Sequence, residues 1–227
     1  MSKIILGIDI GSTKTCAIIA QKSDDTIKIL GAGISKSGGI KKGIITNIEQ
    51  ASRSIKRAVG DAKKVSGTHY DDVIVSISGA YAKSVDSYGV VNVPNNEIGI
   101  NEINRVLQMA DHNANIPAEY ERLHVLPYNF KVDEHSSIDD PLGMNGARLE
   151  VNTHIITVLK SSLNNLKKAI KSASIEATNI VLSGYASSIS VLNDDEKELD
   201  VAVIDIGGAT TDIIVHKGHS IRYNEFV

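Results

Sequence analysis

The chain has 227 residues, 42% of them hydrophobic and 22% charged, which is the composition of an ordinary soluble globular protein. A net charge of −3, a pI near 6.2 and the absence of tryptophan disfavour a nucleic-acid partner. The single cysteine, Cys16, excludes an intramolecular disulfide, and the lack of a long apolar run excludes a membrane-spanning helix, so we expect a cytoplasmic protein.

Hydrophobic patterning predicts a β-meander followed by a helix in the first 80 residues. A glycine-rich loop at 38–43 leads to Asn47, and Gln50 follows three residues later, so Asn47 is a predicted N-cap with a partial capping box. The predicted elements are three strands, one helix and a further strand, at 4–6, 17–20, 26–32, 47–65 and 73–77.

The middle of the chain reads as a separate mixed segment of about 75 residues, the size of a small domain. Its predicted elements are a strand, a helix and two strands, at 84–93, 101–113, 123–132 and 148–159. After it we expect a helix, a strand, a helix, a charged linker and a hairpin, at 163–173, 179–182, 186–192, 193–198 and 201–215.

The sequence contains two copies of one predicted hairpin turn. Ile8–Thr15 reads IDIGSTKT and Ile204–Thr211 reads IDIGGATT, and each copy lies between two apolar runs. Aligning Asp9 with Asp205 also aligns Thr15 with Thr211. A single Asp-x-Gly turn is typical of an ordinary hairpin, whereas two copies in the same register predict a shared ligand.

The chemistry of these turns suits phosphate and magnesium. Glycine lets the backbone approach a ligand, and successive turn N–H groups form a concavity for phosphate oxygens. An aspartate beside an anion site is explained by a divalent cation between them, and magnesium keeps much of its water when it binds. The alternative is that the aspartates only bond their own turns, that the lysine is solvated and that the hydroxyl residues only serve the hairpin turns. The predicted phosphate-binding residues are Gly11, Ser12, Thr13, Lys14, Gly207, Gly208, Thr210 and Thr211, and the predicted metal-binding residues are Asp9 and Asp205.

Motifs along the whole chain resemble the superfamily of actin, sugar-kinase and heat-shock-chaperone ATPases, and within it the bacterial cell-division FtsA family. The segments that carry the resemblance are 7–12, 38–43, 76–79, 123–127, 141–146, 148–150, 184–188 and 195–199. By this resemblance Asp212 matches a third acidic position of chaperone-type ATPases and joins the predicted metal site.

The resemblance implies an α/β fold: an actin-like, ribonuclease-H-like nucleotide-binding domain with an inserted FtsA-specific α+β subdomain. Residues 1–83 plus 159–199 would form subdomain 1A, 84–158 the inserted subdomain 1C, and 200–227 the incomplete start of subdomain 2A. We expect the insert to be a discrete lobe, packed lightly on the nucleotide domain and used for protein contacts.

The implied function is an ATP-binding scaffold, with Mg²⁺, that polymerises and tethers the FtsZ ring to the cytoplasmic membrane. It would be peripheral on the cytoplasmic face of the inner membrane at the division septum. Its implied partners are FtsZ, further copies of itself and later division proteins contacting 84–158. The FtsZ-binding part and a C-terminal membrane helix are expected beyond residue 227, so the chain is expected to be an N-terminal part.

Two other functions share the implied fold: a PilM-like pilus-assembly platform and a sugar-kinase-type phosphotransferase. Relatives that hydrolyse ATP place a Glu or Gln before the helix that precedes the second phosphate turn. Here that place reads Ser183-Gly184-Tyr185, so we expect at most a weak ATPase. The best spare acidic pair, Asp139-Asp140, lies in the insert, where it would not serve as a kinase base.

Overall fold

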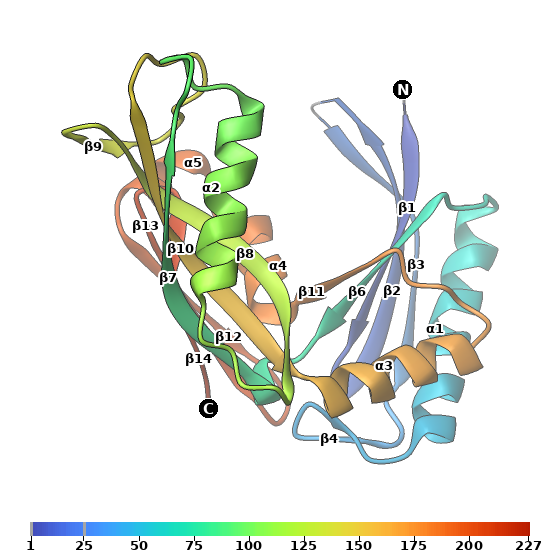
Figure 1. Ribbon diagram of the computed structural model, residues 1–227. Coiled ribbons are helices and arrows are strands. Elements are labelled where there is room, and N and C mark those ends of the chain that lie inside the picture. The colour runs from blue at the N-terminus through green and yellow to red at the C-terminus, as the bar shows by residue number, and fades with distance from the viewer. Residues whose placement is uncertain (1, 25) are drawn as a thin grey trace.

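The computed structural model describes residues 2–24 and 26–227, and its first layer is a five-stranded mixed sheet (Figure 1). The strand order is β11-β6-β1-β2-β3. Strand β1 pairs antiparallel with β2 and parallel with β6, so the predicted meander forms one edge of this sheet. Its strands are β1 (Lys3–Ile10), β2 (Lys14–Ser23), β3 (Thr26–Lys36), β6 (Asp72–Ile77) and β11 (Asn179–Leu182).

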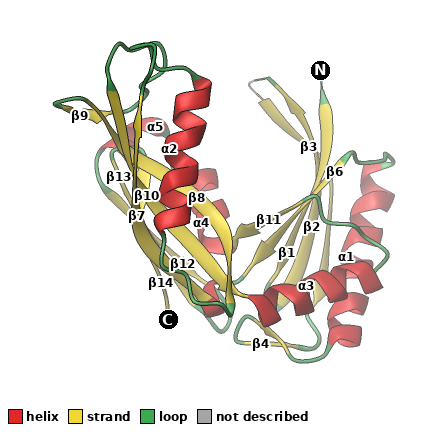
Figure 2. Ribbon diagram, viewed as in Figure 1, coloured by secondary structure: helices red, strands yellow, loops and turns green. Residues whose placement is uncertain are grey.

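Helices α1 (Ile48–Ser66) and α3 (Lys160–Ser172) cover one face of this sheet (Figure 2). The predicted cap of α1 is confirmed, because the Asn47 side chain accepts a hydrogen bond from the Gln50 N–H at 2.9 Å. Short strands β4 (Ile40–Lys41) and β5 (Ile44–Ile45) order the glycine-rich loop before it. Helix α1 lies close to β3 at Gly33, where a Cβ atom would be 2.1 Å from the Ala58 carbonyl oxygen.

The second layer is a four-stranded sheet of order β7-β10-β8-β9, with α2 (Ile100–Asn113) on one face. Its strands are β7 (Ala82–Asn92), β8 (Tyr120–Val132), β9 (His135–Ile138) and β10 (Arg148–Leu159). A 3-10 turn, η1 (Gly79–Tyr81), joins β6 to β7. The predicted strands and helix of the middle segment are confirmed. Strand β9 has no apolar alternation (HSSI), so periodicity could not predict it.

The third layer is a three-stranded sheet that carries the second copy of the repeated turn. It consists of β12 (Val201–Ile206), β13 (Thr211–Lys217) and β14 (Ser220–Phe226), preceded by α4 (Ser183–Val191) and α5 (Asp194–Glu198). The prediction of a linker at 193–198 was wrong. Asn193 and Glu196 form a reciprocal capping box, which stabilises one short helix there.

Helix α4 begins at Ser183, three residues before the predicted start at Ala186. Its first residues include a glycine and its N-cap, Leu182, makes no side-chain cap, so the sequence offers no start signal. Packing explains the difference: a Cβ atom at Gly184 would lie 2.9 Å from the Cβ of Asp212. The glycine therefore lets the first turn of α4 lie directly against β13.

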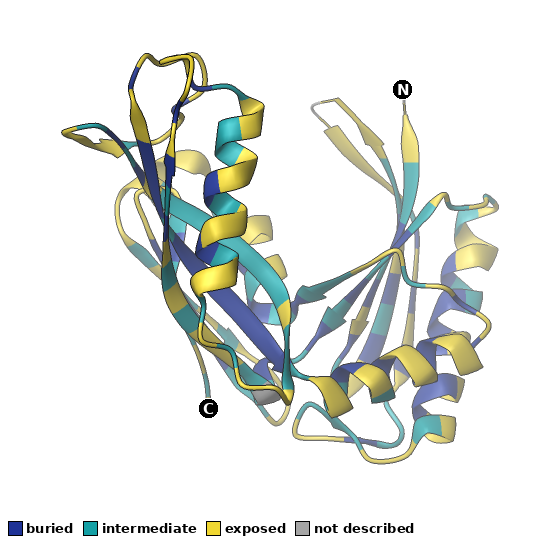
Figure 3. Cartoon of the chain, in the orientation of Figure 1, coloured by how far each residue is buried: buried dark blue, intermediate teal, exposed yellow. Residues whose placement is uncertain are grey.

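The prediction of a lightly packed middle segment was wrong, because this segment shares buried residues with the other two layers. Ile156 of β10 is fully buried with Leu182, Ile214 and Ile221 of the other two layers. Strand β10 is buried along most of its length (Figure 3). These four buried apolar side chains form a core that the three layers share. The boundaries at 84 and 158 stay a prediction.

Candidate functional site

The two copies of the repeated turn are closed by the same backbone hydrogen bond. The Gly11 N–H donates to the Lys14 carbonyl at 3.1 Å, and the Gly207 N–H donates to the Thr210 carbonyl at 2.8 Å. In the strand pairing Asp9 stands opposite Cys16, and Asp205 stands opposite Asp212. The sequence repeat is thus a structural repeat, and Cys16 is the counterpart of Asp212.

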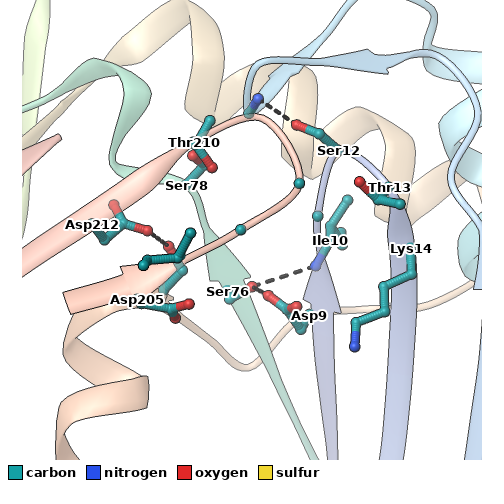
Figure 4. A pocket seen from close by; sticks show the side chains of 16 residues that line it. Asp9, Ile10, Ser12, Thr13, Lys14, Ser76, Ser78, Asp205, Thr210 and Asp212 are labelled. Carbon is teal, nitrogen blue, oxygen red and sulfur yellow. Dashed lines mark hydrogen bonds between the residues drawn. The ribbon is translucent and has the colours of Figure 1, made fainter. Parts of the chain in front are cut away.

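The two turns face each other across a cavity of about 570 Å³ (Figure 4). They nearly touch at one side, where a Cβ atom at Gly208 would lie 1.8 Å from the Thr13 Oγ1. Glycine is required there, because a side chain would separate the turns. The cavity is lined by Asp9, Ile10, Gly11, Ser12, Thr13, Lys14, Gly43, Ser76, Ser78, Ser183, Asp205, Ile206, Gly207, Gly208, Thr210 and Asp212.

All but one of the residues predicted to bind phosphate or metal line this cavity. The exception is Thr211, the first residue of β13, whose backbone pairs with Val227 through hydrogen bonds of 2.8 and 2.9 Å. The sequence analysis included Thr211 as one of the turn hydroxyls, and its counterpart in the first turn, Thr15, is itself fully buried. Their roles in binding stay predictions.

Three aspartates line the cavity, and they influence one another. Burial raises the pKa of Asp212 above its ordinary value, and the charges of Asp205 and Asp9 raise it further. Hydrogen bonds from Ser183 and from the Gly79 backbone oppose this rise in pKa. Among the described residues, no three His, Cys, Asp or Glu side chains are grouped closely enough to ligate one metal ion directly. A cation between these aspartates would therefore keep water in its coordination shell.

Each aspartate accepts a hydrogen bond from a serine hydroxyl to which the sequence analysis gave no binding role. Ser76 donates to Asp9 at 2.6 Å, and Figure 4 shows the two side chains meeting. On α4, Ser187 donates to Asp205 at 2.6 Å and Ser183 donates to Asp212 at 3.1 Å. Ser183 and Ser187 are four residues apart, so they lie on one face of the helix. That spacing was the only available signal.

The glycine-rich loop at 38–43 also contributes to the site. The Gly43 N–H donates to the Ser12 Oγ at 2.8 Å, which holds the loop against the first turn. The Ser12 hydroxyl proton stays free to donate to a phosphate oxygen. Lys14 is the one basic residue among those lining the cavity. In the described part of the chain it forms no ion pair, so its charge is available to an anion.

The residues of the cavity fit a phosphate chain with a hydrated divalent cation. Glycine turns, hydroxyls and one lysine suit the anion, and the aspartates suit the cation. Among the described residues that line the cavity there is no Glu or Gln. The position expected for a water-orienting residue is occupied by Ser183, the first residue of α4.

Comparison with known proteins shows which family this chain resembles. Residues 79–157 match the family model described as the SHS2 domain inserted in FtsA. The chain is 38% identical over 249 residues to the cell division protein FtsA of Helicobacter pylori strain J99, covering 99% of this chain and 50% of that protein. It is 36% identical to FtsA of Pseudomonas aeruginosa, covering 99% of this chain and 54% of that protein. The chain belongs to the FtsA family.

The chain spans about half the length of the curated FtsA relatives that it matches. Among solved structures, the PilM-PilN type IV pilus biogenesis complex has a TM-score of 0.67 at 14% identity, covering 98% of this chain and 61% of that one. The ethanolamine utilization protein EutJ of Carboxydothermus hydrogenoformans has a TM-score of 0.53 at 11% identity, covering 100% and 52%. These likenesses concern the fold alone: an FtsA-type, actin-like α/β fold with an inserted α+β domain.

Proposed function

We propose that this FtsA-family chain binds the phosphates of ATP between its two repeated turns, with Mg²⁺ held near Asp9 and Asp205. The observation that carries the proposal is that two turns closed by the same backbone hydrogen bond line one cavity. Turn N–H groups and hydroxyls would grip the phosphate oxygens, and Lys14 would neutralise part of their charge. Gly207, Gly208 and Thr210 would act from the opposite side.

Titration calorimetry of the complete protein tests this proposal. ATP should bind in the presence of Mg²⁺ and lose affinity when EDTA removes the cation. The Lys14→Met variant should bind ATP more weakly than the wild type. The difference in affinity should grow as the salt concentration falls, because salt screens the interaction of the lost charge with the phosphates. Lys22, on the same strand but outside the cavity, gives a matched control as Lys22→Met.

At the level of the cell, we propose a division-septum protein that polymerises and tethers FtsZ to the cytoplasmic membrane. The support is the sequence similarity to FtsA proteins over the whole chain. Among the described residues, no helix is long and apolar enough to cross a bilayer. Attachment to the membrane and to FtsZ would involve parts of the protein outside the 227 residues, and later division proteins would contact 84–158.

Vesicle co-sedimentation tests the tethering role. The complete protein should bring purified FtsZ down with lipid vesicles. FtsZ mixed with vesicles should not sediment when the complete protein is omitted. Recruitment of a pilus inner-membrane protein in its place would favour a PilM-like function, for which the structural likeness at 14% identity gives no argument beyond the fold.

We propose that any ATP hydrolysis is slow, since the cavity contains no Glu or Gln to orient water. Single-turnover assays should show ATP persisting on the complete protein for many minutes. Rapid turnover with a sugar acceptor would support a phosphotransferase.

A further inference from the structure

We infer that Ser76 and Ser187 are positioning residues that orient Asp9 and Asp205 toward one shared cation, whereas Asp212 is held away from that role. This inference rests on the proposed binding of Mg-ATP. It divides the three acidic residues of the cavity into two that can receive a hydrated cation and one that cannot.

The first part of the argument concerns oxygen atoms that are already engaged. Ser76 donates to the Oδ1 of Asp9, and Ser187 donates to the Oδ2 of Asp205, each at 2.6 Å. In the described residues, no further hydrogen bond or ion pair engages the second oxygen of either carboxylate. Each carboxylate is therefore fixed by one oxygen and offers the other to the cavity.

Asp212 differs because its carboxylate is confined between α4 and the backbone of η1. Ser183 donates to its Oδ2 at 3.1 Å. Its Oδ1 lies so close to Gly79 that a Cβ atom there would be 2.5 Å away. The residue is only 8% exposed. Asp212 thus packs the root of the insert against β13 and offers little to a cation.

The two serines lie on elements outside the repeated turns. Ser76 lies on β6, and its Oγ also accepts a hydrogen bond from the Ile10 N–H at 3.4 Å. Ser187 lies in the second turn of α4. A hydroxyl held in this way limits the rotation of the carboxylate, as outer-shell partners of metal ligands do. Loss of the hydroxyl would let Asp9 or Asp205 rotate away from the cation.

The test measures ATP affinity of the complete protein with Mg²⁺ and with EDTA, and Mn²⁺ binding by electron paramagnetic resonance. Ser76→Ala and Ser187→Ala should each lower affinity for Mg-ATP and for Mn²⁺ in the presence of ATP by about 10- to 100-fold. Affinity for metal-free ATP should change less than twofold. Ser76→Thr, which keeps the hydroxyl, should recover most of the metal dependence.

Ser35→Ala is the matched control, since Ser35 is a buried serine whose hydroxyl donates to the Ser54 carbonyl at 2.7 Å outside the cavity. It should leave the ratio of affinities with and without metal unchanged. If the wild type shows no metal-dependent ATP binding, the proposed function itself fails. If Asp9→Asn abolishes metal dependence while Ser76→Ala and Ser187→Ala retain it, only the positioning role is refuted.

Discussion

Replacing Gly208 with alanine tests whether the two repeated turns act on one ligand. The new Cβ atom would lie 1.8 Å from the Thr13 Oγ1 and 3.0 Å from the Thr13 Cβ. Rotation of the threonine can move its Oγ1 away but cannot change the contact with its Cβ, so the turns must also move apart by a few tenths of an ångström. Strain of this kind costs about 1–3 kcal/mol.

If ATP needs both turns at their present separation, that strain lowers its affinity. A loss of about 1–3 kcal/mol corresponds to an affinity for Mg-ATP reduced about 5- to 150-fold. Calorimetry on the complete protein measures this loss, and urea unfolding of the same sample separates it from general destabilisation. Gly60→Ala in α1 is the control, because nothing lies within 4 Å of its Cβ position.

A double-mutant cycle with Thr13→Ala gives the result that could refute this reasoning. Alanine at position 13 removes the atom 1.8 Å from the new Cβ, so the Gly208→Ala, Thr13→Ala double variant should bind better than the two single losses predict. Unchanged affinity in Gly208→Ala, or independent losses in the cycle, would show that the contact between the turns does not govern binding.

Two further predictions concern stability. Because the folded-state pKa of Asp212 is raised, the folded protein binds a proton more readily than the unfolded chain, and stability falls as pH rises through the carboxylate range. Asp212→Asn should thus compare more favourably with wild type at pH 7 than at pH 3.5 in urea unfolding, and equal differences at both values would contradict this. Gly33→Ala should destabilise the protein by about 3 kcal/mol or more, since its Cβ would lie 2.1 Å from the Ala58 carbonyl oxygen of α1, and a variant as stable as wild type would show that α1 can move.

The sequence predicted the parts of the site that depend on local chemistry. A glycine turn flanked by two apolar runs predicts a hairpin wherever it occurs, and its repetition at Asp9 and Asp205 predicted the facing turns. Asn47 with Gln50 likewise predicted the start of α1, because a side-chain cap is a local interaction.

What the sequence could not provide depends on contacts between distant segments. Ser76 meets Asp9 only because β6 lies beside β1, and Ser187 meets Asp205 only because α4 packs on the third sheet. The early start of α4 follows from the fit of Gly184 against Asp212. The tight packing of the insert likewise depends on Ile156 meeting residues of two other layers.

The most direct test of the account is calorimetric titration of ATP into the complete protein and its Asp9→Ala, Asp205→Ala and double variants, with and without Mg²⁺. If both aspartates act on one cation, each single change should weaken Mg-ATP binding far more than metal-free binding, and the double variant should lose little beyond either single. Fully additive losses, or equal losses with and without Mg²⁺, would contradict a shared cation between the two turns.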